Sequence, residues 1–315
     1  MHPIPIPASR NFFDCSTSPP RDAALSMIWQ LRHRTLDLTT QGAIMGILNV
    51  TPDSFSDGGR FQQTEDAVQR GMEMAADGAA IIDVGGESTR PGATPVDEET
   101  ELSRVIPVIR ALRPLTGAFI SIDTMKPGVA AAALEAGADI LNDVTGFRSA
   151  EMRRLAATSG AGCVVMHMQG DPRTMQHQPS YRDVVREVQS FFADSLASMQ
   201  QEGIAPEQIV LDPGIGFGKN LAHHQALLRA LPTLSIGDRP LLLGVSFKSF
   251  LSTLTGDPAL ASRAWPTIAL TSYAREQGVR ILRVHQVTPN LQALRMTEAI
   301  LANSENSLAP TDHLT

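Results

Sequence analysis

The sequence predicts an α/β protein folded as a single-domain (β/α)8 TIM barrel. Three observations support this prediction. Short apolar runs typical of buried parallel strands recur eight times along the chain. Each run ends abruptly in polar residues, and the segments between the runs have the periodicity of helices. The alternation occupies about 260 residues, which is an ordinary size for this barrel.

The apolar runs define the predicted strands and the polar groups that follow them. In chain order the runs are 46–48 before Asn49, 80–84 before the glycine-rich segment 85–92, 119–122 before Asp123, 140–141 before Asn142, 163–166 before His167, 209–211 before Asp212, 241–245 before Ser246, and 281–282 before Arg283. All strand C-termini lie on one face of a barrel, so these polar groups are expected to converge on one mouth. The competing fold, a doubly wound open sheet, would gather its ligand groups at one crevice. Polar residues at nearly every strand end favour the barrel.

The segments between the strands supply the predicted helices. These cover 65–77, 103–112, 129–134, 184–199 and 291–301. The segment 129–134 is alanine-rich, and the others carry apolar residues at helical spacing. Thr64 is the expected N-cap of the first helix.

The predicted barrel covers residues 27–302. Residues 1–26 are rich in proline and serine, and we expect them to be a mobile N-terminal extension. Residues 303–315 are expected to form a second mobile end.

Composition excludes several classes of protein. The net charge of -7 argues against nucleic-acid binding, which requires a basic surface. No apolar run approaches the roughly 20 residues of a membrane-spanning helix. The N-terminus does not resemble a secretory signal. Of the two cysteines, Cys15 lies in the extension and Cys163 in a strand, so we expect no disulfide and a reducing, cytoplasmic location.

One group of strand-end residues suits a flat heterocycle: Asp123, Asn142, Asp212 and Lys248. Carboxylates accept from an amino-amidine edge, an amide both donates and accepts, and lysine donates to a carbonyl. Any single aspartate there could instead be a helix N-cap. The convergence of several such groups favours a binding site.

A second group suits an anion. Arg283 and His285 leave the last strand, where barrels often bind phosphate. Thr89 and Arg90 lie in the glycine-rich segment 85–92, which also offers backbone N–H groups. His285 alone could equally be a structural histidine, but the adjacent arginine favours an anion site. The glycine-rich segment 212–219 lacks P-loop spacing.

A single candidate metal ligand stands out. Asn49 ends the first strand and offers a hard oxygen, and Mg²⁺ often takes only one or two protein oxygens beside substrate phosphates. The sequence has no HExxH or CxxC pattern, so a dedicated zinc site is not expected. His223 and His224 are expected on a solvated helix. Ser246 lies in no GxSxG elbow.

The most specific motifs are NVTPDSFSDGG at 49–59, GGESTRPG at 85–92, MHMQG at 166–170 and DPGIGFGK at 212–219. In this order they closely resemble the dihydropteroate synthase family, over about residues 36–301. That family condenses 6-hydroxymethyl-7,8-dihydropterin diphosphate with p-aminobenzoate, using Mg²⁺ and releasing pyrophosphate. The resemblance also implies a homodimer, with small molecules as the substrates.

The resemblance assigns a role to each matching residue. It implies that Asp123, Asn142, Asp212 and Lys248 bind the pterin, and that Asn49, Arg90, Arg283 and His285 contact the diphosphate, with Asn49 on the Mg²⁺. Positions similar to the p-aminobenzoate pocket are Phe55, Thr89, Pro91, Phe217 and Ser246. Asp123, Asp212, Lys248, Arg283 and Arg90 are the expected catalytic residues.

Two positions depart from the family pattern. Phe247 stands where most members have arginine, and Gln286 stands where most have aspartate. The changes remove a cation near the arylamine pocket and a carboxylate beside His285. They could be neutral, could alter the handling of p-aminobenzoate and sulfonamides, or could mark a pterin-binding paralogue with reduced, lost or altered activity.

Two other functions share this architecture. A pterin-binding barrel can transfer methyl groups to a corrinoid protein, but a methyl donor carries no diphosphate for the segments 49–59 and 85–92 to bind. A non-catalytic pterin-binding module would bind the heterocycle without Mg²⁺ and without turnover.

Overall fold

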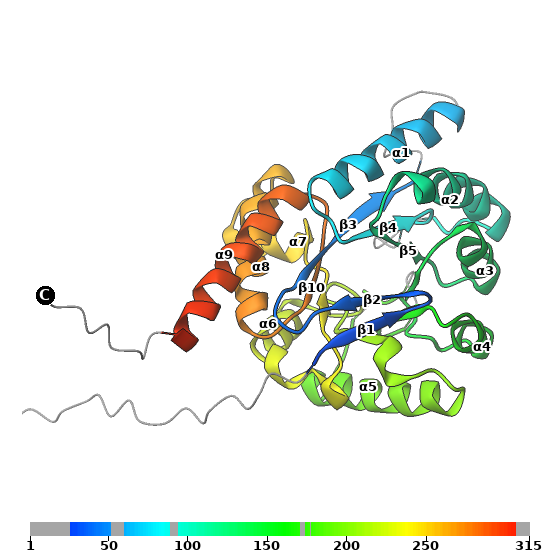
Figure 1. Cartoon of the computed structure of the whole chain (residues 1–315). Coiled ribbons are helices and arrows are strands. Elements are labelled where there is room, and N and C mark those ends of the chain that lie inside the picture. Colours follow the sequence, from blue (N-terminus) through cyan, green and yellow to red (C-terminus); the bar gives the residue numbers. More distant parts are fainter. Residues whose placement is uncertain (1–25, 52–59, 89–93, 171–173, 177, 307–315) are drawn as a thin grey trace, which may run out of the picture.

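Eight parallel strands form the centre of the molecule, confirming the predicted barrel. The computed structural model describes residues 26–51, 60–88, 94–170, 174–176 and 178–306. The strand order is β8-β7-β6-β5-β4-β3-β10-β9. A parallel bridge between Leu211 and Leu241 links the two ends of this order, so the sheet is nearly closed. Figure 1 shows the strands enclosed by helices.

The strands follow the predicted apolar runs. They are β3 (Ala43–Asn49), β4 (Ile81–Gly85), β5 (Phe119–Asp123), β6 (Ile140–Asp143), β7 (Gly162–Met166), β8 (Ile209–Asp212), β9 (Leu242–Leu243) and β10 (Ile281–Val284). Almost every strand residue is buried, as expected for parallel strands covered on both faces.

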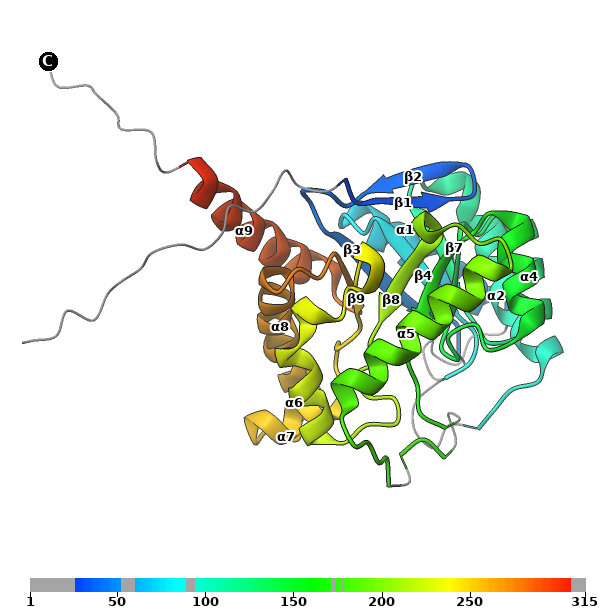
Figure 2. The same cartoon turned by 90° about the horizontal axis from the view of Figure 1, so that it is seen from below.

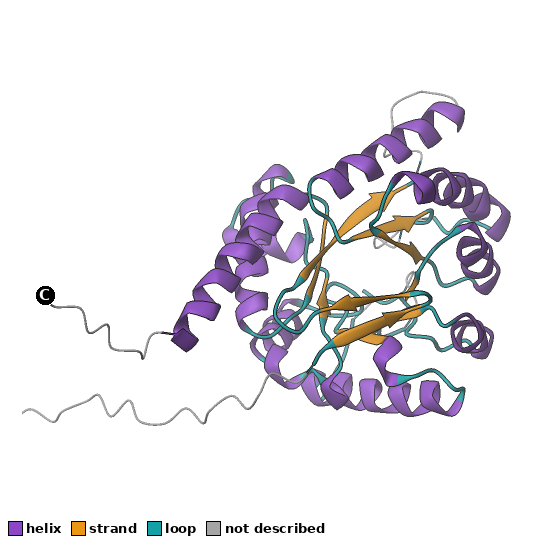
Figure 3. Ribbon diagram, viewed as in Figure 1, coloured by secondary structure: helices purple, strands orange, loops and turns teal. Residues whose placement is uncertain are grey.

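The helices surround the strands, as Figure 3 shows. They are α1 (Arg60–Ala76), α2 (Glu98–Leu112), α3 (Pro127–Ala136), α4 (Ala150–Ser159), α5 (Val184–Gln201), α6 (Leu221–Arg229), α7 (Ser249–Thr255), α8 (Ala264–Glu276) and α9 (Val287–Asn306). In the part of the chain that the structure describes, no helix is long and apolar enough to cross a membrane.

Several predicted helix boundaries differ from the observed ones. Thr64 lies inside α1 rather than capping it, because the helix already begins at Arg60. The second helix begins at Glu98, where the Asp97 side chain accepts a hydrogen bond from the Thr100 amide at 2.6 Å. Apolar periodicity missed this first turn because it is acidic. The last helix continues past residue 302, into the predicted tail.

A hairpin that the sequence did not predict closes the N-terminal end of the barrel. Strands β1 (Ile28–Leu31) and β2 (Arg34–Asp37) are antiparallel and lie across this end (Figure 2). Trp29, Leu31 and Leu38 are fully buried there, in a cluster with interior side chains from all eight barrel strands. The Trp29 indole donates to the carbonyl of Gln208 at 2.8 Å. The hairpin therefore acts as a hydrophobic plug.

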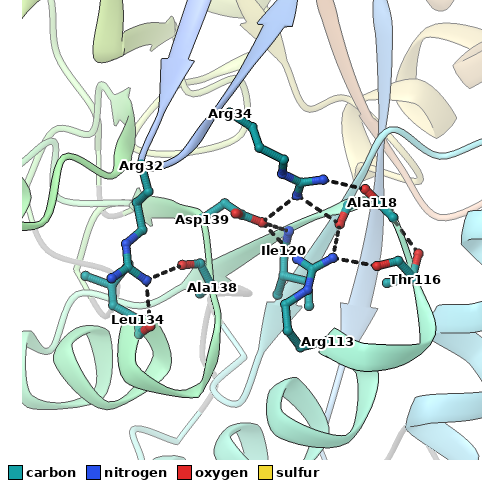
Figure 4. A network of polar contacts seen from close by, with 10 residues as sticks. Arg32, Arg34, Arg113, Thr116, Ala118, Ile120, Leu134, Ala138 and Asp139 are labelled. Carbon is teal, nitrogen blue, oxygen red and sulfur yellow. Dashed lines mark hydrogen bonds and ion pairs between the residues drawn. The ribbon is translucent and has the colours of Figure 1, made fainter.

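Polar contacts fasten the plug to its surroundings (Figure 4). Arg32 donates to the carbonyls of Leu134 and Ala138, at 2.7 and 3.3 Å. Arg34 and Arg113 both pair with Asp139 Oδ2, at 3.2 and 3.0 Å. The same oxygen accepts the amide of Ile120 at 2.9 Å. With this end sealed, the polar groups at the opposite strand ends face the remaining opening.

Candidate active site

Strand register places three predicted residues at one level around the barrel. Asn49 is paired in register with Gly85, Gly85 with Asp123, and Asp123 with Asn142. Each residue lies at or near the C-terminal end of its strand. An ideal Cβ on Gly85 would lie 3.9 Å from both Asn49 Oδ1 and Asp123 Oδ2. The glycine therefore keeps an approach open between these two oxygens.

A compact ionic cluster occupies the centre of the mouth. The Arg283 guanidinium donates from Nε to Asp83 Oδ2 and from Nη2 to Asp123 Oδ2, both at 2.6 Å. Asn142 Nδ2 donates to the same Asp83 oxygen at 3.1 Å. Three predicted residues thus meet around a fourth, Asp83, to which the sequence assigned no role.

The sequence did contain a signal for Asp83. It is the only charged residue in the apolar run 80–84. It also shares strand alternation with Ile81, which faces the barrel interior. A carboxylate inside an interior-facing apolar strand needs a partner, and Arg283 provides it.

Burial sets the ionisation of the charged groups at the mouth. It raises the pKa of Asp123 to about 7, although the Arg283 charge opposes the change. Burial also raises the pKa of Asp212, with Lys248 acting in the opposite sense. It lowers the pKa of Lys248 to about 8, against the favourable charge of Asp212. For Arg283, burial disfavours the cation, but Asp83 and Asp123 outweigh it and raise the pKa. These charges therefore interact strongly with one another.

The glycine-rich segment after β8 wraps around Lys248. The Lys248 ammonium donates to the carbonyl of Ile215 and lies 4.7 Å from the centre of the Phe217 ring. Gly216 has a φ of +90°, and a Cβ there would approach Lys248 Cδ to 2.9 Å. Asp212 accepts the Gly214 amide at 2.8 Å. The segment thus brings the predicted pterin residue Lys248 against the predicted p-aminobenzoate residue Phe217.

Lys219 also supports the glycine-rich segment. The sequence assigned it no role at the site. Its side chain is 2% exposed. The ammonium donates to the carbonyls of Gly214 and Phe217, both at 3.0 Å, and of His167 at 3.2 Å. Burial lowers the pKa of Lys219 to about 7 and that of His167 to about 3. Lys219 therefore joins the segments that follow β7 and β8.

The prediction that His224 lies on a solvated helix was wrong. It lies on α6, but it is buried, and its Nε2 accepts the amide of Gly216 at 3.1 Å. The burial of His224 depends on how α6 packs against the glycine-rich segment, and the local sequence does not reveal this packing. His224 is another support for the glycine-rich segment.

Ser246 and His285 lie at the edge of the mouth. They are next to Phe247, one of the two residues that differ from the family pattern. Ser246 Oγ lies 3.2 Å from the His285 amide, which donates to it, and 3.0 Å from His285 Nδ1. The Phe247 ring meets the His285 ring edge-on, with 5.6 Å between centres. Phe247 has a φ of 57°, which is unusual for a bulky residue. The Gln286 side chain is exposed.

Four predicted site residues lie outside the described residues: Phe55, Thr89, Arg90 and Pro91. Asn49, the predicted Mg²⁺ ligand, is described and partly exposed at the end of β3. Among the described residues, no group of three or more histidine, cysteine, aspartate or glutamate side chains could hold a metal. A site built mainly from substrate oxygens, with Asn49 as a protein ligand, fits this donor set.

Comparisons with known proteins agree with this geometry. The family model described as "Pterin binding enzyme" matches residues 45–285. The dihydropteroate synthase of Escherichia coli K12 is 46% identical over 263 residues, covering 84% of this chain and 93% of that protein. The Yersinia pestis dihydropteroate synthase, solved with a sulfonamide drug complex, is 42% identical with a TM-score of 0.82, covering 88% of this chain and 100% of that chain. The Burkholderia cenocepacia dihydropteroate synthase, complexed with 7,8-dihydropteroate, is 40% identical with a TM-score of 0.81, covering 89% and 99%.

The match to the family model, together with the barrel and the polar cluster at its mouth, makes this chain a pterin-binding enzyme. Within that class the chain belongs to the dihydropteroate synthases, the transferases of folate biosynthesis.

Replacing Gly216 with alanine tests how the glycine-rich segment places Lys248. Gly203 is a matched control, since its φ of +89° is nearly the same but a Cβ there meets no atom within 4 Å. Both substitutions should cost roughly 1–2 kcal/mol of unfolding free energy, measured by urea titration. Only Gly216→Ala should also lower kcat/KM for the pterin substrate, by about tenfold or more, because it displaces Lys248. Equal activities of the two variants would contradict this view of Gly216.

Proposed function

We propose that this enzyme joins 6-hydroxymethyl-7,8-dihydropterin diphosphate to p-aminobenzoate at the described mouth, giving 7,8-dihydropteroate and pyrophosphate. The observation that supports this most is the buried cluster of Asp123, Asn142 and Arg283, with Asp212 and Lys248 beside it. Carboxylates and an amide suit the amino-amidine edge of a pterin, and the Lys248 ammonium suits its carbonyl.

The diphosphate is assigned to the opposite side of the same mouth. Arg283 uses its Nε and one Nη2 hydrogen on Asp83 and Asp123, which leaves its other N–H groups for phosphate oxygens. His285 and Arg90 are the further cationic or donor groups assigned to it. Mg²⁺ held by Asn49 would neutralise charge on the diphosphate.

The reaction then follows from the charge distribution. The bond between the pterin methylene and the diphosphate oxygen breaks, and the electron pair leaves with pyrophosphate. Arg283 and His285 stabilise the negative charge that grows on this leaving group. The ionised forms of Asp123 and Asp212 stabilise the cationic pterin. The arylamine nitrogen attacks the methylene carbon and then loses a proton, so no strong catalytic base is needed.

The p-aminobenzoate ring is assigned to the space between the glycine-rich segment and the β9–α7 turn. Phe217 and Ser246 are two of its walls. Phe217 lies beside Lys248 of the proposed pterin set, and Ser246 lies beside His285 of the proposed diphosphate set. Phe55, Thr89 and Pro91 are the further walls expected from the family resemblance.

The reaction is tested directly with the purified protein. Incubation with both substrates and Mg²⁺ should release pyrophosphate and form dihydropteroate in equal amounts. Chelation of Mg²⁺ should abolish turnover, and Asn49→Ala should raise the Mg²⁺ concentration needed for half-maximal rate. Pterin binding without product would instead indicate a paralogue that has lost synthase activity.

Phe247 offers a test of specificity. Its ring packs on His285, so we propose that it narrows the arylamine pocket against sulfonamides. Phe247→Arg should therefore strengthen sulfonamide inhibition by several-fold, seen as a lower inhibition constant relative to the KM for p-aminobenzoate. Gln286→Asp is the control, because the Gln286 side chain is exposed and should leave inhibition unchanged. Identical inhibition of the wild type and Phe247→Arg would exclude this role.

We further propose that the enzyme is a homodimer, as the family resemblance implies. An apolar groove of about 460 Å³ lies between α6, α7 and α8, and the exposed Leu254 and Trp265 line it. Trp265 is 77% exposed and Leu254 is 48% exposed, so the groove offers an apolar surface that a partner could cover. Light scattering should give twice the chain mass for the wild type and a lower mass for Trp265→Glu. A wild type that stays monomeric at high concentration would exclude the dimer.

A further inference from the structure

Asp83 is an interior carboxylate with an unusual set of contacts. Its side chain is fully buried in the middle of β4. One oxygen, Oδ2, accepts both Arg283 Nε at 2.6 Å and Asn142 Nδ2 at 3.1 Å. Within the described residues the other oxygen, Oδ1, is buried without a hydrogen-bond partner. A buried carboxylate is costly unless it is paired, so the contacts through Oδ2 hold it in place.

We propose that Asp83 is a positioning residue for the pterin site. By orienting Asn142 and Arg283 together, it fixes which of their groups are left to donate or accept hydrogen bonds at the site. This proposal rests on the pterin site proposed above. Asp83 does not itself touch substrate. It acts through two residues on different strands, β6 and β10, and so couples the heterocycle side of the mouth to the anion side.

The direction in which the Asn142 amide is turned follows from the chemistry of the Asp83 carboxylate. An ionised carboxylate only accepts hydrogen bonds, so Asn142 must turn its NH2 toward Asp83. The carbonyl oxygen of the Asn142 amide is then turned away from Asp83 and accepts from the ligand. The site therefore selects a heterocycle with an N–H or amino donor at that position.

Asp83 orients Arg283 in the same way. The edge of the guanidinium formed by Nε and Nη2 donates to Asp83 and Asp123, which leaves the remaining Nη hydrogens for an anion. Arg283 is also held from two directions, by carboxylates on adjacent strands β4 and β5. A rigid guanidinium loses little conformational entropy when an anion binds.

Asp83 also acts on the ionisation of Asp123. The charged groups that influence the pKa of Asp123 are Arg283 on β10, Asp83 on β4, Glu101 on α2 and Asp143 on β6, and Lys248 lies on the same mouth. The negative charge of Asp83 raises the Asp123 pKa. Its removal should lower that pKa and let Asp123 ionise at lower pH.

Asp83→Asn is the first variant to test, because the amide keeps the size of the side chain but loses the charge. It can donate as well as accept, so it no longer fixes which way the Asn142 amide is turned. We expect the affinity for the pterin diphosphate, measured by calorimetry with Mg²⁺, to weaken by about tenfold. The KM for p-aminobenzoate should change by less than about twofold, because Asp83 lies on the pterin side. The acid limb of the kcat/KM profile should move to lower pH, which a purely structural defect would not produce.

Two further variants separate position from charge. Asp83→Glu keeps the charge but moves the carboxylate, so pterin affinity should fall without the shift to lower pH. Asp143→Asn removes another buried charge near Asp123, but Asp143 contacts Thr145 and the Phe147 amide rather than Asn142 or Arg283. This control should therefore keep the wild-type pterin affinity to within about threefold. If Asp83→Asn does not fold, Asp83→Glu alone decides the positioning role.

The outcomes distinguish the two proposals. An active wild type with Asp83 variants of unchanged pterin affinity and pH profile overturns the role of Asp83 and leaves the synthase reaction in place. A wild type that binds pterin without turnover overturns the reaction, and the calorimetric comparison of wild type with the Asp83 variants still decides the positioning role.

Discussion

The organisation of the mouth depends on one partly buried cation, the Arg283 guanidinium, held between Asp83 and Asp123. The two carboxylates lie on neighbouring strands and offset the cost of removing the guanidinium from most of its water. Two carboxylates on one guanidinium also leave net negative charge beside the proposed pterin site, while the remaining guanidinium N–H groups are the donors proposed for the diphosphate. A substrate that separates into a cation and a diphosphate fits this polarity, because each fragment meets the opposite charge.

A second set of contacts, made by buried polar side chains, holds the loops at the mouth rather than the strands. The Lys219 ammonium donates to three carbonyl groups in two loops, and His224 accepts the backbone amide of Gly216. Both side chains are buried. Together they give the glycine-rich segment a fixed shape, although its glycines would otherwise allow many conformations. The proposed p-aminobenzoate side of the site is thus ordered by buried polar groups, whereas the proposed pterin side is ordered by the barrel strands.

The sequence predicted the barrel and the residues at its strand ends because both depend on local pattern. Apolar runs ending at Asp123, Asn142 and Asp212 placed them correctly at one mouth. The hairpin at 28–37 was missed because its strands are short and Trp29 packs against distant residues. The role of Asp83 and the burial of His224 depend on partners far along the chain. The Mg²⁺ site, the residue roles and the cytoplasmic location remain predictions.

The plug formed by β1 and β2 has a consequence for synthesis of the chain. Trp29 is among the first described residues to leave the ribosome, yet its hydrogen-bond partner Gln208 follows 179 positions later. Its apolar neighbours in the plug, from Met45 to Ile281, span almost the whole barrel. The hairpin can therefore reach its final place only after most of the chain has emerged, and until then it presents a tryptophan and two leucines to solvent or to chaperones.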